Sequence, residues 1–70
     1  MTTTQTYTVT GMTCDHCVAS VTEEVSEVAG VTDVHVDLAS GAVTVTSDAA
    51  ITDDAVRDAV TEAGYELVGA

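Results

Sequence analysis

The chain has 70 residues, of which 12 are Asp or Glu and one is basic, so its formal net charge at pH 7 is -11. This charge excludes a nucleic-acid-binding role, because one arginine cannot neutralise several phosphates and a strongly acidic protein repels a polyanion. No apolar run approaches the roughly 18 residues of a membrane-spanning helix. The N-terminus lacks the basic and apolar regions of a signal peptide, so we expect a cytoplasmic protein without membrane insertion.

The predicted core is small. Hydrophobic residues make up 46% of the chain, but they are mostly Val and Ala, with no Phe or Trp. A chain of this length buries roughly 60% of its unfolded surface, so a metal, a disulfide or oligomerisation could add to its stability. The near absence of basic residues also predicts adaptation to high salt, in which carboxylates are screened from one another. The alternative is an acidic surface that complements a basic partner.

The first predicted elements are a strand and a helix. Residues 5–10 alternate between apolar and polar side chains, as in a half-buried strand, and Gly11 ends that strand. The threonines before residue 5 are expected to form a frayed end. Four valines then recur at helical spacing, and Ala29-Gly30 is expected to end this helix. The valines are Val18, Val21, Val25 and Val28.

Two alternating segments follow and predict a hairpin. Val34, Val36 and Leu38 define the first strand, and Val43 and Val45 define the second. The connection Ala39-Ser40-Gly41 has three residues with glycine last, which is typical of a hairpin between antiparallel strands.

The last predicted elements are a second helix and a short strand. Thr52 is expected to cap the helix, whose first turn carries Asp53 and Asp54. Its apolar face is formed by Val56, Ala59, Val60 and Ala63. Gly64 is expected to end the helix, before a strand that includes Tyr65, Leu67 and Gly69.

The element order is therefore β-α-β-β-α-β. This order predicts an α+β, ferredoxin-like fold, in which a four-stranded antiparallel sheet carries two helices on one face. No linker or low-complexity segment divides the chain, so residues 1–70 are predicted to form a single domain that is ordered from about residue 5.

Both cysteines lie in residues 11–17, with the sequence Gly-Met-Thr-Cys-Asp-His-Cys, between the first strand and the first helix. Two thiols separated by two residues can bind one ion when the first lies on a loop and the second in the opening turn of a helix. The free amides and the dipole at a helix N-terminus favour thiolates, which are the form that binds metal. Cys14 and Cys17 are therefore the candidate metal ligands.

The number and type of ligands favour Cu(I). A structural zinc site needs four ligands, and this chain could complete the set only with His16 and the distant His35. Two soft thiolates suit Cu(I), whereas carboxylates are ligands of hard ions. A site with two ligands also leaves the metal open to an incoming thiol, so the ion can pass to another protein without being released.

Residues 11–17 resemble the Gly-Met-[Thr/Ser]-Cys-x-x-Cys signature of the heavy-metal-associated domain family. This family comprises copper chaperones, N-terminal domains of copper-transporting P-type ATPases and the mercury-binding protein of mercury resistance. The resemblance covers roughly residues 5–70 and implies the same ferredoxin-like fold. It also implies that Cys14 and Cys17 bind Cu(I), that Met12 is an apolar anchor under the loop, and that Tyr65 lies beside the metal, as in the prokaryotic chaperones.

Other roles are open for the residues near the cysteines. His16 could join the metal site, most easily across a dimer, or it could be an exposed residue at the start of the helix. Met12 could be a thioether ligand, and Tyr65 could belong only to the core. Asp15 could cap the first helix, and His35 is expected on the outer face of a strand. A thioredoxin-type redox pair is disfavoured because the chain has no Trp or Pro.

These observations predict a copper chaperone that is not an enzyme. It would bind one Cu(I) and deliver it by thiolate exchange, with a copper-transporting P-type ATPase as the expected partner. We expect a monomer, with copper-driven dimerisation left open. One alternative is a regulatory domain of such an ATPase, which the initiator-like Met1 and an end soon after the last strand disfavour. The other alternative is a Hg(II) or Zn(II) binding module.

Overall fold

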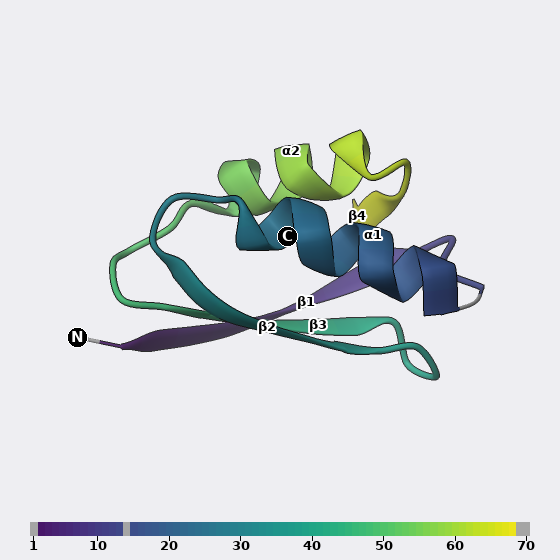
Figure 1. The fold of residues 1–70 in the computed structure, drawn as a ribbon, viewed down its shortest axis with the longest axis horizontal. Helices are drawn as coiled ribbons and strands as arrows, with labels where there is room; N and C mark the ends of the chain where they lie inside the picture. The colour runs from purple at the N-terminus through teal and green to yellow at the C-terminus, as the bar shows by residue number, and fades with distance from the viewer. Residues whose placement is uncertain (1, 14, 69–70) are drawn as a thin grey trace.

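The computed structural model describes residues 2–13 and 15–68. These residues form a four-stranded sheet and two helices, and both helices cover the same face of the sheet (Figure 1). The elements are β1 (Thr3–Thr10), α1 (Asp15–Ser26), β2 (Val31–Asp37), β3 (Ala42–Ser47), α2 (Asp53–Glu62) and β4 (Glu66–Val68).

The strands lie in the order β2-β3-β1-β4, and each neighbouring pair is antiparallel. β1 pairs with β3 from Thr3 to Thr8, but it pairs with β4 only from Thr8 to Thr10. β3 therefore lies between the two strands that α1 connects, which is the split βαβ arrangement. The predicted α+β, ferredoxin-like fold is confirmed.

The hydrophobic core lies between the sheet and the helices and consists mainly of valines. Spacing of four residues in each helix and two residues in β3 places a pair of valines from each element on the inner side. All six are fully buried: Val21, Val25, Val43, Val45, Val56 and Val60. The periodicities in the sequence therefore identify the inner faces of these elements correctly.

β1 begins two residues before its predicted start. The expectation of a frayed end is wrong for Thr3 and Thr4, because these residues pair with Ser47 and Thr46 of β3. Thr3 and Thr4 are not part of an alternating apolar pattern, so the sequence does not indicate a strand there. Their backbone is ordered by pairing with the central strand β3.

α1 ends earlier than predicted, at Ser26 rather than at Ala29-Gly30. The amides of Glu27 and Val28 bond to carbonyls three residues back, at 3.2 and 3.1 Å, and this tighter turn replaces the last helical turn. Gly30 still adopts a φ of 93°, and its carbonyl accepts a hydrogen bond from Asp48.

The hairpin between β2 and β3 contains four residues, 38–41, so Leu38 lies in the turn and not in the strand as predicted. The amide of Gly41 donates to the carbonyl of Asp37 over 2.8 Å and closes the turn. Gly41 has the expected left-handed conformation, with a φ of 75°. Its carbonyl accepts a 2.8 Å hydrogen bond from Val9, which attaches the turn to β1.

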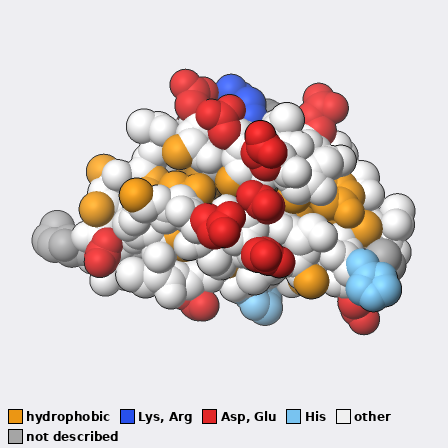
Figure 2. All heavy atoms as spheres, turned by 45° about the horizontal axis from the view of Figure 1, so that its top comes forward, with side chains coloured by type: hydrophobic (Ala, Val, Ile, Leu, Met, Phe, Trp, Pro, Cys, Tyr) orange, Lys and Arg blue, Asp and Glu red, His pale blue; other side chains and the backbone are white. Residues whose placement is uncertain are grey.

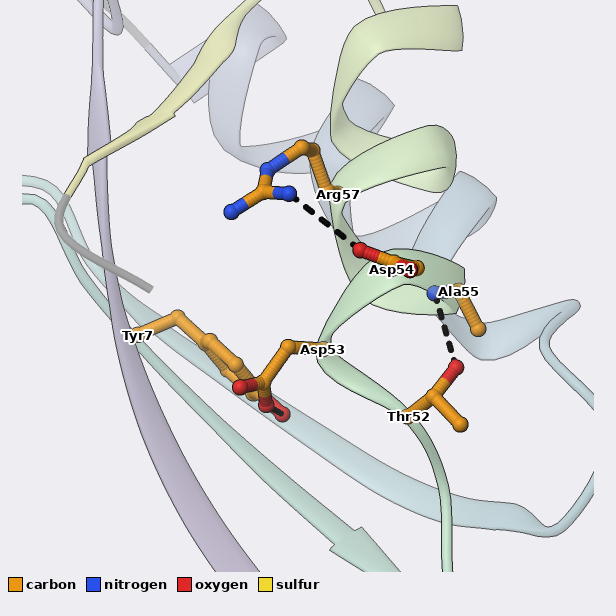
Figure 3. A network of polar contacts seen from close by, with 6 residues as sticks. All are labelled: Tyr7, Thr52, Asp53, Asp54, Ala55 and Arg57. Carbon is orange, nitrogen blue, oxygen red and sulfur yellow. Dashed lines mark hydrogen bonds and ion pairs between the residues drawn. The ribbon is translucent and has the colours of Figure 1, made fainter.

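The start of α2 is fixed by polar contacts (Figure 3). Thr52 is the predicted N-cap, and its hydroxyl accepts a 3.1 Å hydrogen bond from the amide of Ala55. Tyr7 of β1 shares its hydroxyl proton between Asp53 Oδ1, at 3.0 Å, and Gln5 Oε1. Burial, followed by the hydrogen bond and charge of Asp53, raises the pKa of Tyr7 to about 12. These contacts hold α2 against β1.

Replacing the cap, Thr52→Ala, is expected to lower the free energy of unfolding by about 1 kcal/mol, since the amide of Ala55 loses its acceptor. Urea denaturation monitored by circular dichroism measures this loss. Thr52→Ser keeps the acceptor oxygen and is the control. A Ser variant that is destabilised as much as the Ala variant would show that the hydroxyl is not responsible.

Candidate metal-binding loop

The candidate loop lies at the end of the molecule where β1 stops and α1 starts. Residues 11–13 follow β1, and α1 begins at Asp15. α2 ends at the same edge, so the segment that leads from it into β4 lies beside the loop (Figure 1). Cys14, the first of the two expected metal ligands, lies outside the described residues.

Cys17 is the third residue of α1 and is buried, with a relative exposure of 8%. Its position in the first turn agrees with the expected placement of the second thiol at a helix N-terminus. The amides of that turn and the helix dipole favour a negative charge there. The hydroxyl oxygen of Thr13 lies 3.9 Å from Cys17 Sγ. This end of the helix can therefore stabilise a thiolate without any basic side chain.

Met12 and Tyr65 connect the loop to the hydrophobic core, and Tyr65 lies beside Gly11. Met12 is half-buried and packs against the hydrophobic core, which is the position expected of an apolar anchor. Gly11 has a φ of 92°, and a Cβ added there would lie 3.4 Å from Cδ1 of the Tyr65 ring. Tyr65 is itself half-buried and packs against the core. The fold thus brings Tyr65 next to the loop, although 54 positions separate it from Gly11 in sequence.

The other polar residues named from the sequence are exposed. His16 is exposed in the first turn of α1, and Asp15 is the first helical residue rather than the residue that precedes the helix. His35 is exposed on β2, opposite Thr44 of β3, and so lies on the sheet face that carries no helix. The structure therefore groups Met12, His16, Cys17 and Tyr65 at the loop and keeps His35 apart from it.

Thr13 was not identified from the sequence as a residue of the site. Its hydroxyl approaches Cys17 because the two residues are four positions apart across the start of α1. That spacing is the signal that could have identified it, once the helix start is placed at Asp15.

The surface around the loop and over the helices is strongly acidic. Of the Asp and Glu side chains, all but Glu24 are exposed, and several lie on the helix-covered face (Figure 2). The one arginine, Arg57, forms an ion pair with Asp54 at 3.2 Å within α2. Any metal bound at the loop therefore lies in a negative field.

Among residues 2–13 and 15–68, no three His, Cys, Asp or Glu side chains gather closely enough to hold a metal ion. In the same residues, no helix is long and apolar enough to cross a membrane.

Comparisons with known proteins place this chain in a family. The model of the heavy-metal-associated domain matches residues 6–66. The copper chaperone CopZ of Bacillus subtilis is 41% identical over 64 residues, which is 90% of this chain and 93% of that protein.

Two solved structures have the same fold. Oxidised MerP from Ralstonia metallidurans superposes with a TM-score of 0.85 at 35% identity, covering 96% of this chain and 94% of the other. A copper binding domain from HMA7, a P-type ATPase, gives a TM-score of 0.84 at 29% identity, covering 91% and 88% of the two chains. Since the family model spans most of the residues and includes the loop, the chain belongs to the heavy-metal-associated domain family.

Proposed function

We propose that this protein is a copper chaperone that binds one Cu(I) through Cys14 and Cys17. The observation that carries the proposal is the buried Cys17 in the first turn of α1, beside the hydroxyl of Thr13 and shortly after Met12, which packs against the hydrophobic core. Two thiolates at a helix N-terminus are a soft, low-coordinate ligand set, which suits Cu(I) better than hard ions. In this role the protein is a carrier and not an enzyme.

The exposed side of the loop supports transfer by ligand exchange. Gly11, Thr13 and His16 are exposed, so the thiol of a partner can approach the metal from solvent. An incoming thiolate would bind the copper, and one of the original sulfurs would then leave. A partner of similar shape is a metal-binding domain of a copper-transporting P-type ATPase, and a domain of this kind shares the present fold.

A transfer experiment tests this function. Copper-loaded protein is mixed anaerobically with the apo form of such an ATPase domain, in the presence of a chromophoric Cu(I) chelator too weak to remove copper from either protein. We expect copper to redistribute between the proteins with no chelator complex formed. Transfer no faster than the release of copper from the loaded protein alone, measured separately with an excess of a strong chelator, would contradict direct exchange.

A Hg(II) or Zn(II) binding module is the second candidate, and the similarity to MerP favours its mercury version. A regulatory domain within a P-type ATPase is a further alternative, favoured by the similarity to the domain from HMA7. Either alternative function would use the same cysteine pair, Cys14 and Cys17. Measured preference for Cu(I) over Hg(II) and Zn(II) in the presence of a competing thiol separates the metals.

Metal binding by Cys14 and Cys17 would also point to a location. A compartment that keeps thiols reduced is required for metal binding, and the cytoplasm provides one. We therefore propose a cytoplasmic location. We also propose that the protein is a monomer. His16, exposed beside Cys17, would supply the extra ligand if copper brings two copies together.

We further propose that the acidic surface is an adaptation to high salt. The melting temperature is expected to rise by roughly 10 °C from low-salt buffer to molar KCl, because repulsion among the exposed carboxylates is then screened. Sucrose stabilises proteins without screening charge, so it is the control for general solute effects. A melting temperature that does not change with KCl would contradict the adaptation and leave a basic partner as the explanation of the charge.

A further inference from the structure

Leu38 is a large apolar side chain that lies outside the hydrophobic core. It continues the alternating pattern of β2 in the sequence, but the structure places it in the turn of residues 38–41. It is half-buried, and it is not among the described residues that pack against the core. Part of its apolar surface therefore remains available for a contact with another molecule.

The turn of residues 38–41 lies at the same end of the molecule as the candidate metal-binding loop. The amide of Val9 donates a 2.8 Å hydrogen bond to the carbonyl of Gly41, and residues 11–13 follow soon after Val9. Figure 1 shows the turn, the loop and the start of β4 at this one end. A partner that reaches a metal at the loop must approach this end.

The connections at the metal end carry no charged side chain among the described residues. These connections are residues 11–13, 38–41 and 63–65. The connections at the opposite end, residues 27–30 and 48–52, contain Glu27 and Asp48. The carboxylates at the metal end lie at the termini of helices and strands: Asp15, Asp37, Glu62 and Glu66. A chain with a formal net charge of -11 thus presents an uncharged centre with an acidic rim at this end.

An uncharged centre with a charged rim is the usual anatomy of a protein–protein interface. In molar KCl the range of electrostatic interactions falls to about 3 Å, so charges on the rim cannot attract or repel a partner from a distance. Burial of apolar surface does not depend on charge and persists under these conditions. The uncharged centre can therefore recognise a partner at any salt concentration.

We propose that the turn of residues 38–41 is a docking element for the metal-binding domain of a copper-transporting P-type ATPase. Leu38 is its apolar contact, and the surface that it meets on the partner is uncharged. The turn does not bind metal, so it contributes to the rate of transfer and not to copper affinity. This inference rests on the proposed delivery of Cu(I) and names part of the surface through which it takes place.

The test compares Ala39→Asp with Ala50→Asp in the full chain. Both alanines are exposed in connections, at opposite ends of the molecule, and each substitution adds one negative charge. The second-order rate constant of copper transfer to the apo ATPase domain of the transfer experiment is measured anaerobically in low salt and in molar KCl. We expect Ala39→Asp to slow transfer about tenfold in both buffers, since it places a charge against an uncharged surface. Ala50→Asp is expected to transfer copper in molar KCl as the original protein does.

A second variant removes the apolar contact without adding charge. Leu38→Asn keeps a residue that is common in turns and is expected to slow transfer about fivefold in molar KCl, because apolar burial is lost. Chelator competition is expected to give the same Cu(I) affinity for all three variants, and circular dichroism verifies their fold.

Two results would overturn the docking role. One is equal transfer rates for Ala39→Asp and Ala50→Asp in molar KCl. The other is a loss in Ala39→Asp that disappears in molar KCl, since it would come from long-range repulsion and not from contact. An original protein that binds Cu(I) but transfers none to the domain would overturn the proposed delivery, and the docking role with it.

Discussion

Cys17→Ser is expected to lower Cu(I) affinity by more than about a hundredfold, because residues that only surround a metal ligand already contribute about 10–100-fold. The substitution removes the buried sulfur at the start of α1 and leaves a hydroxyl, which is a hard and weak ligand for Cu(I). Anaerobic chelator competition measures the affinity.

The control for this prediction is His35→Asn. His35 is exposed on the open sheet face, so the substitution removes an imidazole, a side chain of a type that can bind copper, without touching the loop. We expect that variant to bind copper as the original protein does. Circular dichroism of both apo variants verifies the fold. A folded Cys17→Ser protein with unchanged affinity would exclude Cys17 as a ligand.

Gly41→Ala is expected to destabilise the fold by roughly 3 kcal/mol. Two effects add at this position: the backbone has a left-handed φ of 75°, and a Cβ would lie 2.6 Å from the carbonyl oxygen of Val9. That oxygen belongs to a central strand and cannot move away without disturbing the pairing of β1. Urea denaturation of the apo protein measures the change.

Gly64→Ala is the matched control for Gly41→Ala. Gly64 has a similar positive φ of 96°, but a Cβ there would have no neighbour within 4 Å. Only the conformational cost remains, so a loss of about 1 kcal/mol is expected. Equal losses at both glycines would mean that the contact with Val9 contributes nothing.

Much of the fold could be predicted because the inner faces consist of regularly spaced valines. Val21 and Val25 follow the helical period, and Val43 and Val45 follow the strand period, and all four are fully buried. The cap at Thr52 was predictable as well, because its hydroxyl acts on a residue three positions away. Local chemistry and periodicity are sufficient for such features.

The ends of elements were harder to predict because they depend on contacts distant in sequence. Thr3 and Thr4 become ordered by pairing with β3, and the hairpin turn is held by a hydrogen bond from Val9 to Gly41. α1 ends early because a tighter turn leads into β2. Neither hydrophobic periodicity nor turn residues report these contacts.

The candidate site divides in the same way. The cysteine pair and the start of the helix follow from a short motif, whereas the packing of Tyr65 against Gly11 requires that β4 pair with the end of β1. The resemblance to a known family supplied that expectation, not the spacing of residues. The contact of Thr13 with Cys17 needed the helix start to be placed to within one residue.

The binding of one Cu(I) by the cysteine pair is tested most directly by a single titration. The reduced protein and the double variant Cys14→Ser/Cys17→Ser compete anaerobically with a chromophoric chelator for Cu(I), in low salt and in molar KCl. We predict that the original protein removes one copper per chain from the chelator in both buffers, and that the double variant removes none. A double variant that competes equally well, or an original protein that fails to compete with both thiols reduced, would contradict a dithiolate copper carrier.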